Sequence, residues 1–317
     1  MNLKELIIPP QGEGERVDRL IHRYFPELPE GSVRAAFLRR DIKLDGKRVA
    51  KEVRVQTGQQ LRIDLPEAEK EIPLAIIYED ADVMLVNKPA GISVEPDGKG
   101  GITLTDLCAR AVREGALPAE NVFLPAACHR LDNQTSGLCL FAKNAPALET
   151  MTEIFRERSL EKEYECLVRG IPKPPRAECR AWLIKDAKAA RVRVLDHPKE
   201  GAKRIITAYD TIEAGPVSRL RIHLITGRTH QIRAHLASEG FPVIGDPKYG
   251  GRGINKEMEE KYGLKSQFLH AWRLEFREAY GSLSGMKGKI LIDPLPESLE
   301  RMACRIFGDE WKTIYDS

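Results

Sequence analysis

The sequence predicts an α+β protein, in which a mixed, largely antiparallel β-sheet domain with flanking helices follows a small unit of two helices and a β-hairpin. Short apolar stretches with strand-like alternation outnumber the segments with helical periodicity. The 317 residues exceed the roughly 150 of an average domain, which predicts two domains. A charged stretch without apolar periodicity divides them. We therefore expect domains at 1–65 and 72–317, joined by a linker at 66–71.

The N-terminal part begins with an amphipathic helix over residues 16–28, whose apolar side chains fall at helical spacing while its arginines lie largely on other faces. A second helix is expected from Ser32, a favourable N-cap residue, through Arg40. A strand then follows and returns after an Asp45-Gly46 turn. Apolar residues alternate again between 53 and 63, which completes a small β unit.

The second part alternates short strands with occasional helices. Expected strands are residues 83–86, 138–142, 164–168 and 218–225, the last with strict alternation of apolar and basic side chains. One helix is expected over 104–114, because Thr103 and Asp106 form a capping box and Gly115 follows. Another is expected over 229–239, where Gly240 supplies the stop. Strands dominate, which favours α+β over α/β.

Charge is distributed unevenly along the chain. The formal net charge is only +3, yet residues 16–63 hold twelve Lys or Arg against six Asp or Glu, a net of +6, which leaves −3 for the rest. A basic N-terminal segment of this kind is typical of contact with an anionic partner. No stretch approaches the roughly 18 apolar residues that span a bilayer, and no secretory leader is evident. We expect a cytoplasmic protein without a membrane partner.

The densest polar segment is residues 127–137, Ala-Cys-His-Arg-Leu-Asp-Asn-Gln-Thr-Ser-Gly, directly before an expected strand. Loops that a rigid sheet positions are where binding and catalytic residues concentrate. On its own, however, Asp132-Asn133 could equally be a turn in which the side chains bond their own backbone.

The segment from His129 to Gly137, HRLDNQTSG, resembles the signature HRLDxxTSG of the RluA-type pseudouridine synthases in every specified position. Further segments similar to that family lie in the same order, at 78–91 with its Asn-Lys-Pro-Ala-Gly turn, at 162–164, at 226–236 with 245–246, and at 269–271. The resemblance covers roughly 72–280. It implies an RNA-modifying isomerase that converts uridine to pseudouridine and needs neither a cofactor nor a metal.

The resemblance also implies roles for single residues. Asp132 stands at the catalytic aspartate, whose carboxylate attacks the nucleoside and must stay ionised in a partly desolvated site. Arg228 stands at the basic residue that pairs with this carboxylate, although an arginine there could also form an ordinary surface ion pair. Tyr164 stands at the active-site tyrosine, whose ring can stack on uracil, and its alternative is a half-buried strand aromatic. His129 matches too, but a lone histidine is more often structural.

RNA recognition is expected from two further sets of residues. Arg130 matches the family arginine that fills the gap left by an extruded base. The N-terminal part resembles the small RNA-binding domain named after ribosomal protein S-four, and this implies phosphate contacts by Arg34, Arg39 and Arg40, which could otherwise simply solubilise a helix face. We expect structured RNA as the partner, ribosomal RNA in preference to transfer RNA, and a monomeric protein.

Two other functions stay open at this point. A catalytically silent RNA-binding or ribosome-assembly protein could keep the same fold. A nucleoside or glycoside hydrolase would also use a carboxylate, but it would need a second carboxyl group and a positioned water. The intact set Asp132, Tyr164 and Arg228 argues against the first, and no second carboxyl group is evident for the other.

Overall fold

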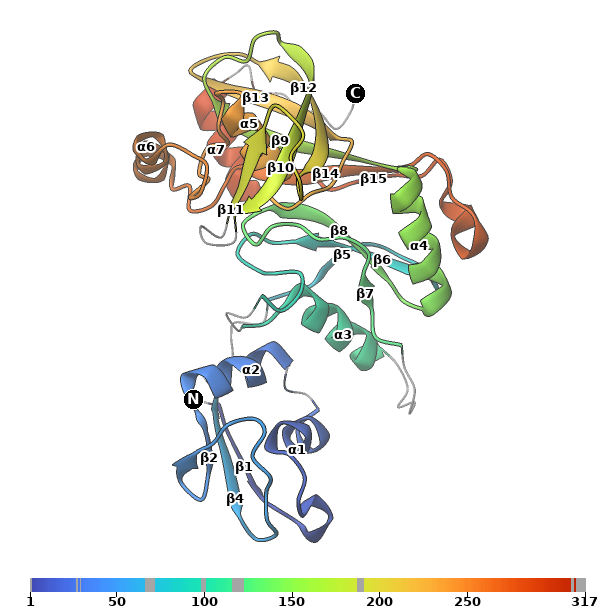
Figure 1. The fold of residues 1–317 in the computed structure, drawn as a ribbon, viewed down its shortest axis with the longest axis vertical. Helices are drawn as coiled ribbons and strands as arrows, with labels where there is room; N and C mark the ends of the chain where they lie inside the picture. Colours follow the sequence, from blue (N-terminus) through green and yellow to red (C-terminus); the bar gives the residue numbers. More distant parts are fainter. Residues whose placement is uncertain are drawn as a thin grey trace. The chain divides into compact units, whose positions relative to one another are not determined.

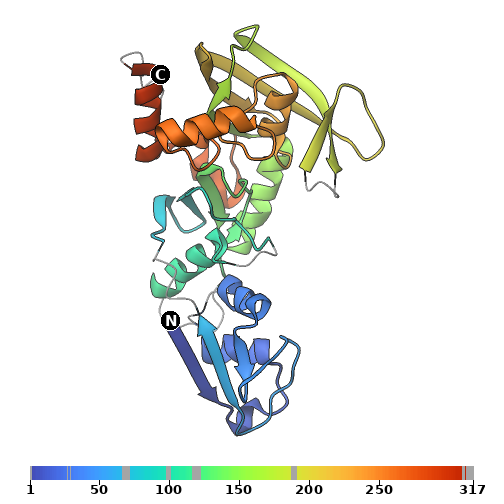
Figure 2. The ribbon, with the colours of Figure 1, turned by 90° about the vertical axis from the view of Figure 1, so that its left-hand side faces the viewer.

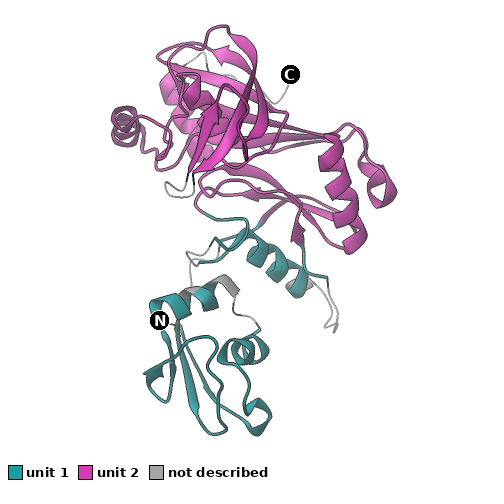
Figure 3. Ribbon diagram, viewed as in Figure 1, with its two compact units in different colours: residues 1–74, 92–125 teal, residues 75–91, 126–317 magenta. Residues whose placement is uncertain are grey.

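The structure is a computed structural model that describes residues 2–26, 28, 30–65, 72–97, 101–115, 123–186, 191–308 and 311. The chain divides into two compact units (Figure 3). One contains residues 1–74 and 92–125, and the other contains 75–91 and 126–317. The predicted linker at 66–71 lies outside the described residues. The division into domains at 65 and 72 therefore stays a prediction.

The unit of residues 1–74 and 92–125 contains a four-stranded sheet in the order β1-β4-β2-β3. Its elements are β1 (Asn2–Ile7), a 3-10 turn (Pro10–Gly12), α1 (Val17–Tyr24), α2 (Glu30–Arg39), β2 (Ile42–Leu44), β3 (Lys47–Arg48), β4 (Gln60–Leu65) and α3 (Leu104–Gly115). The apolar faces of α1 and α2 pack with the inward residues of β2 and β4 in one core. Two helices and a hairpin thus share a single apolar cluster.

Most of the expected local structure of this unit is confirmed. Both predicted helices are present, and the hairpin turns at Asp45 and Gly46, whose φ angles of 49° and 75° suit a tight two-residue turn. The capping box of α3 is formed, since the Thr103 amide donates to Asp106 and the Asp106 amide donates back to the Thr103 hydroxyl. Strand β1 was not predicted, because its partner β4 lies nearly sixty residues away and no local pattern reveals that pairing.

The second unit is built on one large sheet, shown with its strand labels in Figure 1. The strands run in the order β11-β10-β12-β13-β9-β14-β8-β6-β5, with β15 beside β14 and β7 beside β8. Their bounds are β5 (Ala75–Glu79), β6 (Val83–Lys88), β7 (Ala126–Ala127), β8 (Ser136–Ala142), β9 (Leu160–Arg169), β10 (Arg176–Asp186), β11 (Arg191–Leu195), β12 (Lys203–Glu213), β13 (Val217–Leu224), β14 (Leu269–Phe276) and β15 (Ile290–Ile292). Among these described pairings only β14 with β8 is parallel.

Helices cover the sheet at several places. The second unit carries α4 (Ala145–Glu157), α5 (Gln231–Ser238), α6 (Arg252–Tyr262), a 3-10 segment (Gly281–Met286) and α7 (Glu297–Phe307). Helix α4 packs its apolar side chains on β6 and β8. Helix α5 lies over β11 and β12, and α6 and α7 share a third apolar cluster, seen side by side in Figure 2. Helix α5 is the one that positions the candidate site.

The predicted fold class is confirmed, since the sheet is mixed, largely antiparallel and flanked by helices. The four expected strands correspond to β6, β8, β9 and β13, and the two expected helices to α3 and α5. Strands β10 to β12 and helices α4, α6 and α7 were not predicted. A local signal existed for α7, because its buried residues Leu299, Met302 and Ala303 fall at helical spacing. In the described part of the chain, no helix is long and apolar enough to cross a membrane.

Candidate active site

Asp132 lies in the loop that leads into β8, and the loop is held at both of its sides. The Thr135 amide donates to the Asp132 carbonyl at 3.0 Å, which closes a turn. The Asn133 carbonyl accepts from the Gly91 amide at 2.8 Å, so the loop is joined to the turn that follows β6. The Asp132 side chain is 22% exposed. Its carboxylate is therefore rigidly mounted and still reachable.

Lys88, the last residue of β6, is hydrogen-bonded to this loop. Its ammonium group donates to the carbonyls of Pro89 at 2.8 Å and Asn133 at 2.9 Å, and its side chain is fully buried. Burial lowers the pKa of Lys88 to about 8, against the opposing effects of Cys139 and the Asp132 carboxylate. A buried ammonium thus ties the turn after β6 to the Asp132 loop.

The cation on Asp132 is Arg233, in the first turn of α5. One guanidinium nitrogen donates to Asp132 Oδ2 at 2.7 Å, while the other side of the same fork donates to both oxygens of Asp246 at 2.7 and 2.9 Å. Asp246 is fully buried and also accepts the amides of Lys248 and Tyr249. Because the bidentate contact with Asp246 fixes the plane of the guanidinium, the remaining N–H is aimed at Asp132.

The charges of this triad depend on each other. Burial alone would lower the pKa of Arg233, but its hydrogen bonds to Asp246 and the charge of Asp132 outweigh burial, and the pKa lies above its usual value. Burial would likewise raise the pKa of Asp246, but the Arg233 hydrogen bonds outweigh it and keep that carboxyl ionised. Asp246 therefore accepts hydrogen bonds and holds no proton to donate.

The expectation for Arg228 is corrected by this geometry. Arg228 is exposed, in the loop before α5, and the guanidinium that pairs with Asp132 belongs to Arg233. The physical reason is the helix start. His230 adopts a left-handed conformation with φ 54°, so the chain turns sharply and the following helix directs its third residue inward. The Arg228 amide, rather than its side chain, is anchored, because it donates to the side chain of Gln231.

Tyr164 lies in the middle of β9, opposite Ile222 of β13 and Ala271 of β14. It is 5% exposed, and burial raises the pKa of its phenol, which the negative charge of Asp132 raises further. The hydroxyl therefore stays protonated. It also lies near enough to Asp132 for the negative charge of the carboxylate to affect its pKa. Because Ile222 also pairs with Tyr209 of β12, this face of the sheet is the one that α5 covers, and we call it the α5 face.

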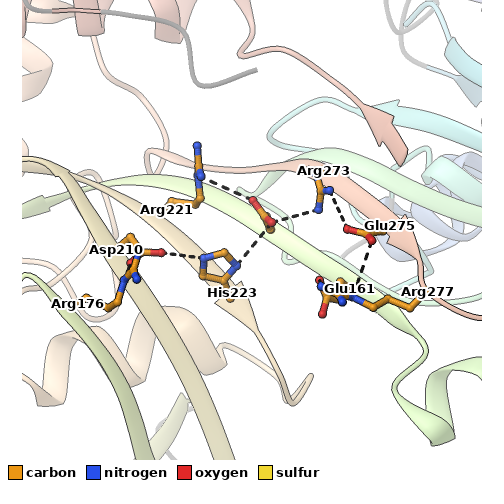
Figure 4. Close-up of polar contacts among 9 residues, drawn as sticks. Glu161, Arg176, Asp210, Arg221, His223, Arg273, Glu275 and Arg277 are labelled. Carbon is orange, nitrogen blue, oxygen red and sulfur yellow. Dashed lines mark hydrogen bonds and ion pairs between the residues drawn. The ribbon is translucent and has the colours of Figure 1, made fainter. Parts of the chain in front are cut away.

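The opposite face of the same strands carries a network of ion pairs, drawn in Figure 4. Glu163 accepts from Arg273 at 3.1 Å, and His223 lies between Glu163 and Asp210 at 3.6 and 3.0 Å. These contacts join β9 to β14 on one side and, through β13, to β12 on the other. Since Glu163 directly precedes Tyr164, the network holds the strand that presents the tyrosine.

The residues predicted to contact RNA are on the surface. Arg130, two positions before Asp132, is exposed, and so are Arg34 within α2 and Arg40 directly after it. Arg39 is 45% exposed and forms a 2.8 Å ion pair with Asp41. The structure therefore brings Asp132 and Tyr164 together in one site, adds Arg233, and leaves the four predicted RNA-contacting arginines accessible.

His129 makes structural contacts, and no chemical role was expected for it. Its ring accepts a hydrogen bond from the Leu140 amide at 3.1 Å. Burial, together with the nearby charge of Lys162, lowers the pKa of His129 to about 3, so the ring is neutral. Within the described residues, no three His, Cys, Asp or Glu side chains converge in a way that could hold a metal ion.

Sequence reasoning missed the roles of Arg233, Asp246 and Lys88, although all three lie inside segments that it singled out. A local signal existed for Arg233, because two arginines five positions apart flank the start of a predicted helix, and either could have faced Asp132. Nothing local marks Asp246 as the partner of that arginine. The pairing exists only because α5 and the turn after it fold back together.

Comparison with known proteins identifies relatives of this chain. The family model described as RNA pseudouridylate synthase matches residues 82–238. An uncharacterized RNA pseudouridine synthase of Aquifex aeolicus is 32% identical over 288 residues, which cover 84% of this chain and 87% of that protein. The ribosomal large subunit pseudouridine synthase C of Escherichia coli is 31% identical over 291 residues, which cover 87% and 89%. The solved human RNA Pseudouridylate Synthase Domain Containing 1 shares the fold, with a TM-score of 0.57 and 24% identity over 75% of this chain and 90% of that one.

Proposed function

This chain belongs to the RNA pseudouridylate synthase family, and on that premise we propose that it isomerises uridine in structured RNA, ribosomal RNA in particular, with Asp132 as its nucleophilic carboxylate. An enzyme of this family is an isomerase that acts on RNA. The preference for ribosomal RNA is supported by similarity to a protein named for the large ribosomal subunit. A ribosomal RNA substrate would in turn support a cytoplasmic location for the enzyme.

One observation carries the role of Asp132, namely the 2.7 Å ion pair with an arginine that is itself clamped by a buried carboxylate. Arg233 is 6% exposed, whereas Asp132 is 22% exposed. The cation is thus hidden from solvent and the anion faces outward, which suits a carboxylate that must stay charged and still meet a substrate. An ion pair that served stability alone would have no need to leave its anion accessible.

The reaction balances without a second reactant. The bond between C1′ and N1 of uridine breaks, a bond between C1′ and C5 forms, N1 gains a proton, and the C5 proton is released. The carboxylate of Asp132 starts the cleavage by attacking the nucleoside. The buried phenol of Tyr164 supplies a flat, apolar surface on which the detached uracil can stack while it turns, and its hydroxyl, held protonated, can donate a hydrogen bond.

A hydrolase is disfavoured by the same geometry. Hydrolytic glycosidases need a second carboxyl group that donates or accepts a proton at the scissile bond. Among the described residues, the second carboxylate on Arg233 is Asp246, which is fully buried, ionised and occupied by four hydrogen bonds. It can neither reach a substrate nor donate a proton. Transfer within one nucleoside fits the site better than hydrolysis.

RNA binding is proposed to involve the exposed arginines. Uracil in structured RNA must leave its stack at a cost of a few kcal/mol, and the planar cation of Arg130, so close to Asp132 in sequence, suits the vacated position. Residues 1–65 would add phosphate contacts through Arg34, Arg39 and Arg40, as a module like that of ribosomal protein S-four does. Since Asp132, Tyr164 and Arg233 all come from one chain, we propose a monomeric enzyme.

The decisive experiment measures tritium release from RNA labelled at C5 of uridine, together with a map of the modified positions. The wild-type protein should release tritium and leave pseudouridine at the mapped site. Free uracil in solution would instead identify a hydrolase. RNA binding without any tritium release, from ribosomal RNA or transfer RNA, would identify the catalytically silent alternative.

A further inference from the structure

A buried chain of hydrogen bonds lies behind the Asp132 loop, on the face of the sheet opposite to Tyr164. Ser136 Oγ is 2.9 Å from His270 Nδ1, and His270 Nε2 is 2.9 Å from the main-chain carbonyl of Asp293. Asn87 donates to the Asp293 carboxylate at 2.9 Å. As whole residues, Ser136, His270 and Asp293 are at most 3% exposed. The reaction proposed above uses none of these groups.

Strand register shows on which face of the sheet the side chain of His270 lies. Ala271 is paired with Tyr164 and shares its face, so the preceding residue, His270, points to the other side of the sheet. The residue opposite His270 on β9 is Glu165, which is fully buried and holds Arg219 at 2.7 Å. Around the ring, the facing polar groups are therefore Ser136 from β8, Glu165 from β9 and Asp293 after β15.

The direction of each hydrogen bond can be assigned. Burial lowers the pKa of His270 to about 4, so the ring is neutral and carries one proton. The carbonyl of Asp293 can only accept, which places that proton on Nε2. Nδ1 must then accept, and the Ser136 hydroxyl donates to it. The imidazole thus holds the serine hydroxyl in one orientation.

Ser136 is the first residue of β8 and directly follows the turn that contains Asp132. The turn that contains Asp132 closes at Thr135, and Gly137, with φ 112°, lies so close to β14 that an added Cβ would be 2.3 Å from the Ala271 carbonyl oxygen. The parallel ladder of β8 with β14 has only two residue pairs, at 270 with 136 and 271 with 137. On its other side β8 pairs with β6 from Gly137 onward, so Ser136 itself is held toward β14, where its hydroxyl contact with His270 reinforces the short ladder.

We propose that His270 is a positioning residue for Asp132, which it sets in place through Ser136, and that Asp293 and Asn87 hold the imidazole. The inference rests on the proposed role of Asp132. A carboxylate displaced by about 1 Å from its productive position can lose on the order of 100-fold in rate. Ser136, His270 and Asp293 are of the residue types that form a hydrolytic triad, but they cannot act as one. Ser136 is 2% exposed and faces away from Tyr164, so it cannot attack a substrate.

Two substitutions of the ring separate its two contacts. The amide of Asn reaches the place of Nδ1 and can accept from Ser136, whereas the amide of Gln reaches the place of Nε2 and can donate only to the Asp293 carbonyl. We expect His270→Asn to keep single-turnover rates within about fivefold of wild type and His270→Gln to lose roughly 30-fold. The dissociation constant for RNA should change in neither, because the ring is buried away from any RNA contact.

Ser136→Ala removes one atom and should reproduce the loss of rate seen with His270→Gln. The matched control is Ser218→Ala, because Ser218 is a similarly buried serine of the same sheet whose hydroxyl, among the described residues, bonds to the backbone of Gly215. It should lower the thermal midpoint about as much and leave the rate unchanged. If His270→Gln does not fold, Ser136→Ala against Ser218→Ala still decides the question.

Equal rates for wild type and Ser136→Ala would overturn the inference, as would equal losses for His270→Asn and His270→Gln. A loss of RNA affinity with an unchanged single-turnover rate would also contradict it. The proposed function fails by a separate result, namely tritium release by Asp132→Ala. If Asp132→Ala is inactive while Ser136→Ala is as fast as wild type, only the positioning role is wrong.

Discussion

The two units of this protein differ in how deeply their arginine–carboxylate pairs are buried, although both also contain exposed pairs between near neighbours. In residues 1–74 the pairs Arg16–Asp18, Arg39–Asp41 and Arg62–Asp64 join neighbours two positions apart, and their side chains are 21% to 45% exposed. In the other unit Arg233 meets Asp132 across 101 positions and Arg219 meets Glu165 across 54, with both arginines at most 6% exposed.

The difference separates two uses of positive charge. Exposed local pairs contribute between about 0 and 1 kcal/mol to stability and can exchange a carboxylate for an RNA phosphate at little cost. A buried pair is tolerated only with matching geometry, and removing one partner leaves an uncompensated charge. The exposed arginines of the first unit can therefore bind RNA phosphates. In the second unit the buried Arg233 fixes the carboxylate of Asp132.

The largest effect should come from Asp132→Asn. The substitution keeps the size of the side chain and removes the negative charge that attacks the nucleoside. We expect tritium release to fall by at least about 1000-fold, while RNA affinity stays within about twofold. Asp196→Asn, at a 94% exposed carboxylate that pairs with the neighbouring His197, is the control and should be fully active. A Asp132→Asn protein with near wild-type turnover would remove the basis of the comparison.

Substitution of Arg233 by Met should cost roughly 100-fold in rate, and it should also destabilise the fold by about 3 to 5 kcal/mol, because buried Asp246 loses its partner. Arg228→Met, five positions earlier at an exposed site, should alter the rate less than about tenfold and leave stability unchanged. Urea unfolding and single-turnover rates of the two variants distinguish the arginines. Larger losses for Arg228→Met would restore the original assignment.

The buried carboxyl of Asp293 should make stability depend on pH. Burial raises the pKa of Asp293 to about 7, whereas in the unfolded chain it titrates near its usual value. Between these values the folded protein holds one proton more than the unfolded chain, so stability falls as pH rises. The decrease should be roughly 2 kcal/mol between pH 5 and pH 7. Asp293→Asn should lack this part of the slope in urea unfolding, and an identical slope in both proteins would contradict the prediction.

The smallest effects should come from the exposed arginines of the first unit. Replacing Arg34 and Arg40 together by Ala should weaken RNA binding about tenfold and lower the slope of log affinity against log salt by roughly 1 to 2, because each lost phosphate contact releases one counterion fewer. Single-turnover rates at saturating RNA should not change. Arg156→Ala, at an exposed arginine of the other unit that pairs with Glu153, is the control and should change neither the affinity nor the slope. An unchanged salt slope would mean that these arginines only solubilise their helix.

Local sequence determined much of the outcome. Helical spacing, the Thr103–Asp106 capping box and the Asp45-Gly46 turn predicted their elements, because each of these signals acts over a few residues. The nine residues from His129 to Gly137 were enough to mark the loop of the candidate nucleophile. A strand such as β1 escaped prediction, since nothing near residues 2–7 shows that β4 will pair with them.

Tertiary structure alone decided which charges meet. Asp132 and Arg233 are 101 positions apart in sequence, and the arginine reaches the loop because α5 packs on β11 and β12 of the sheet. A motif records which residue types are present but not which way each one points. The choice of Arg233 over Arg228, the clamp by Asp246 and the buried link from Ser136 to His270 all depend on contacts distant in sequence. Such contacts form only when burial makes an unpaired polar group too costly to leave.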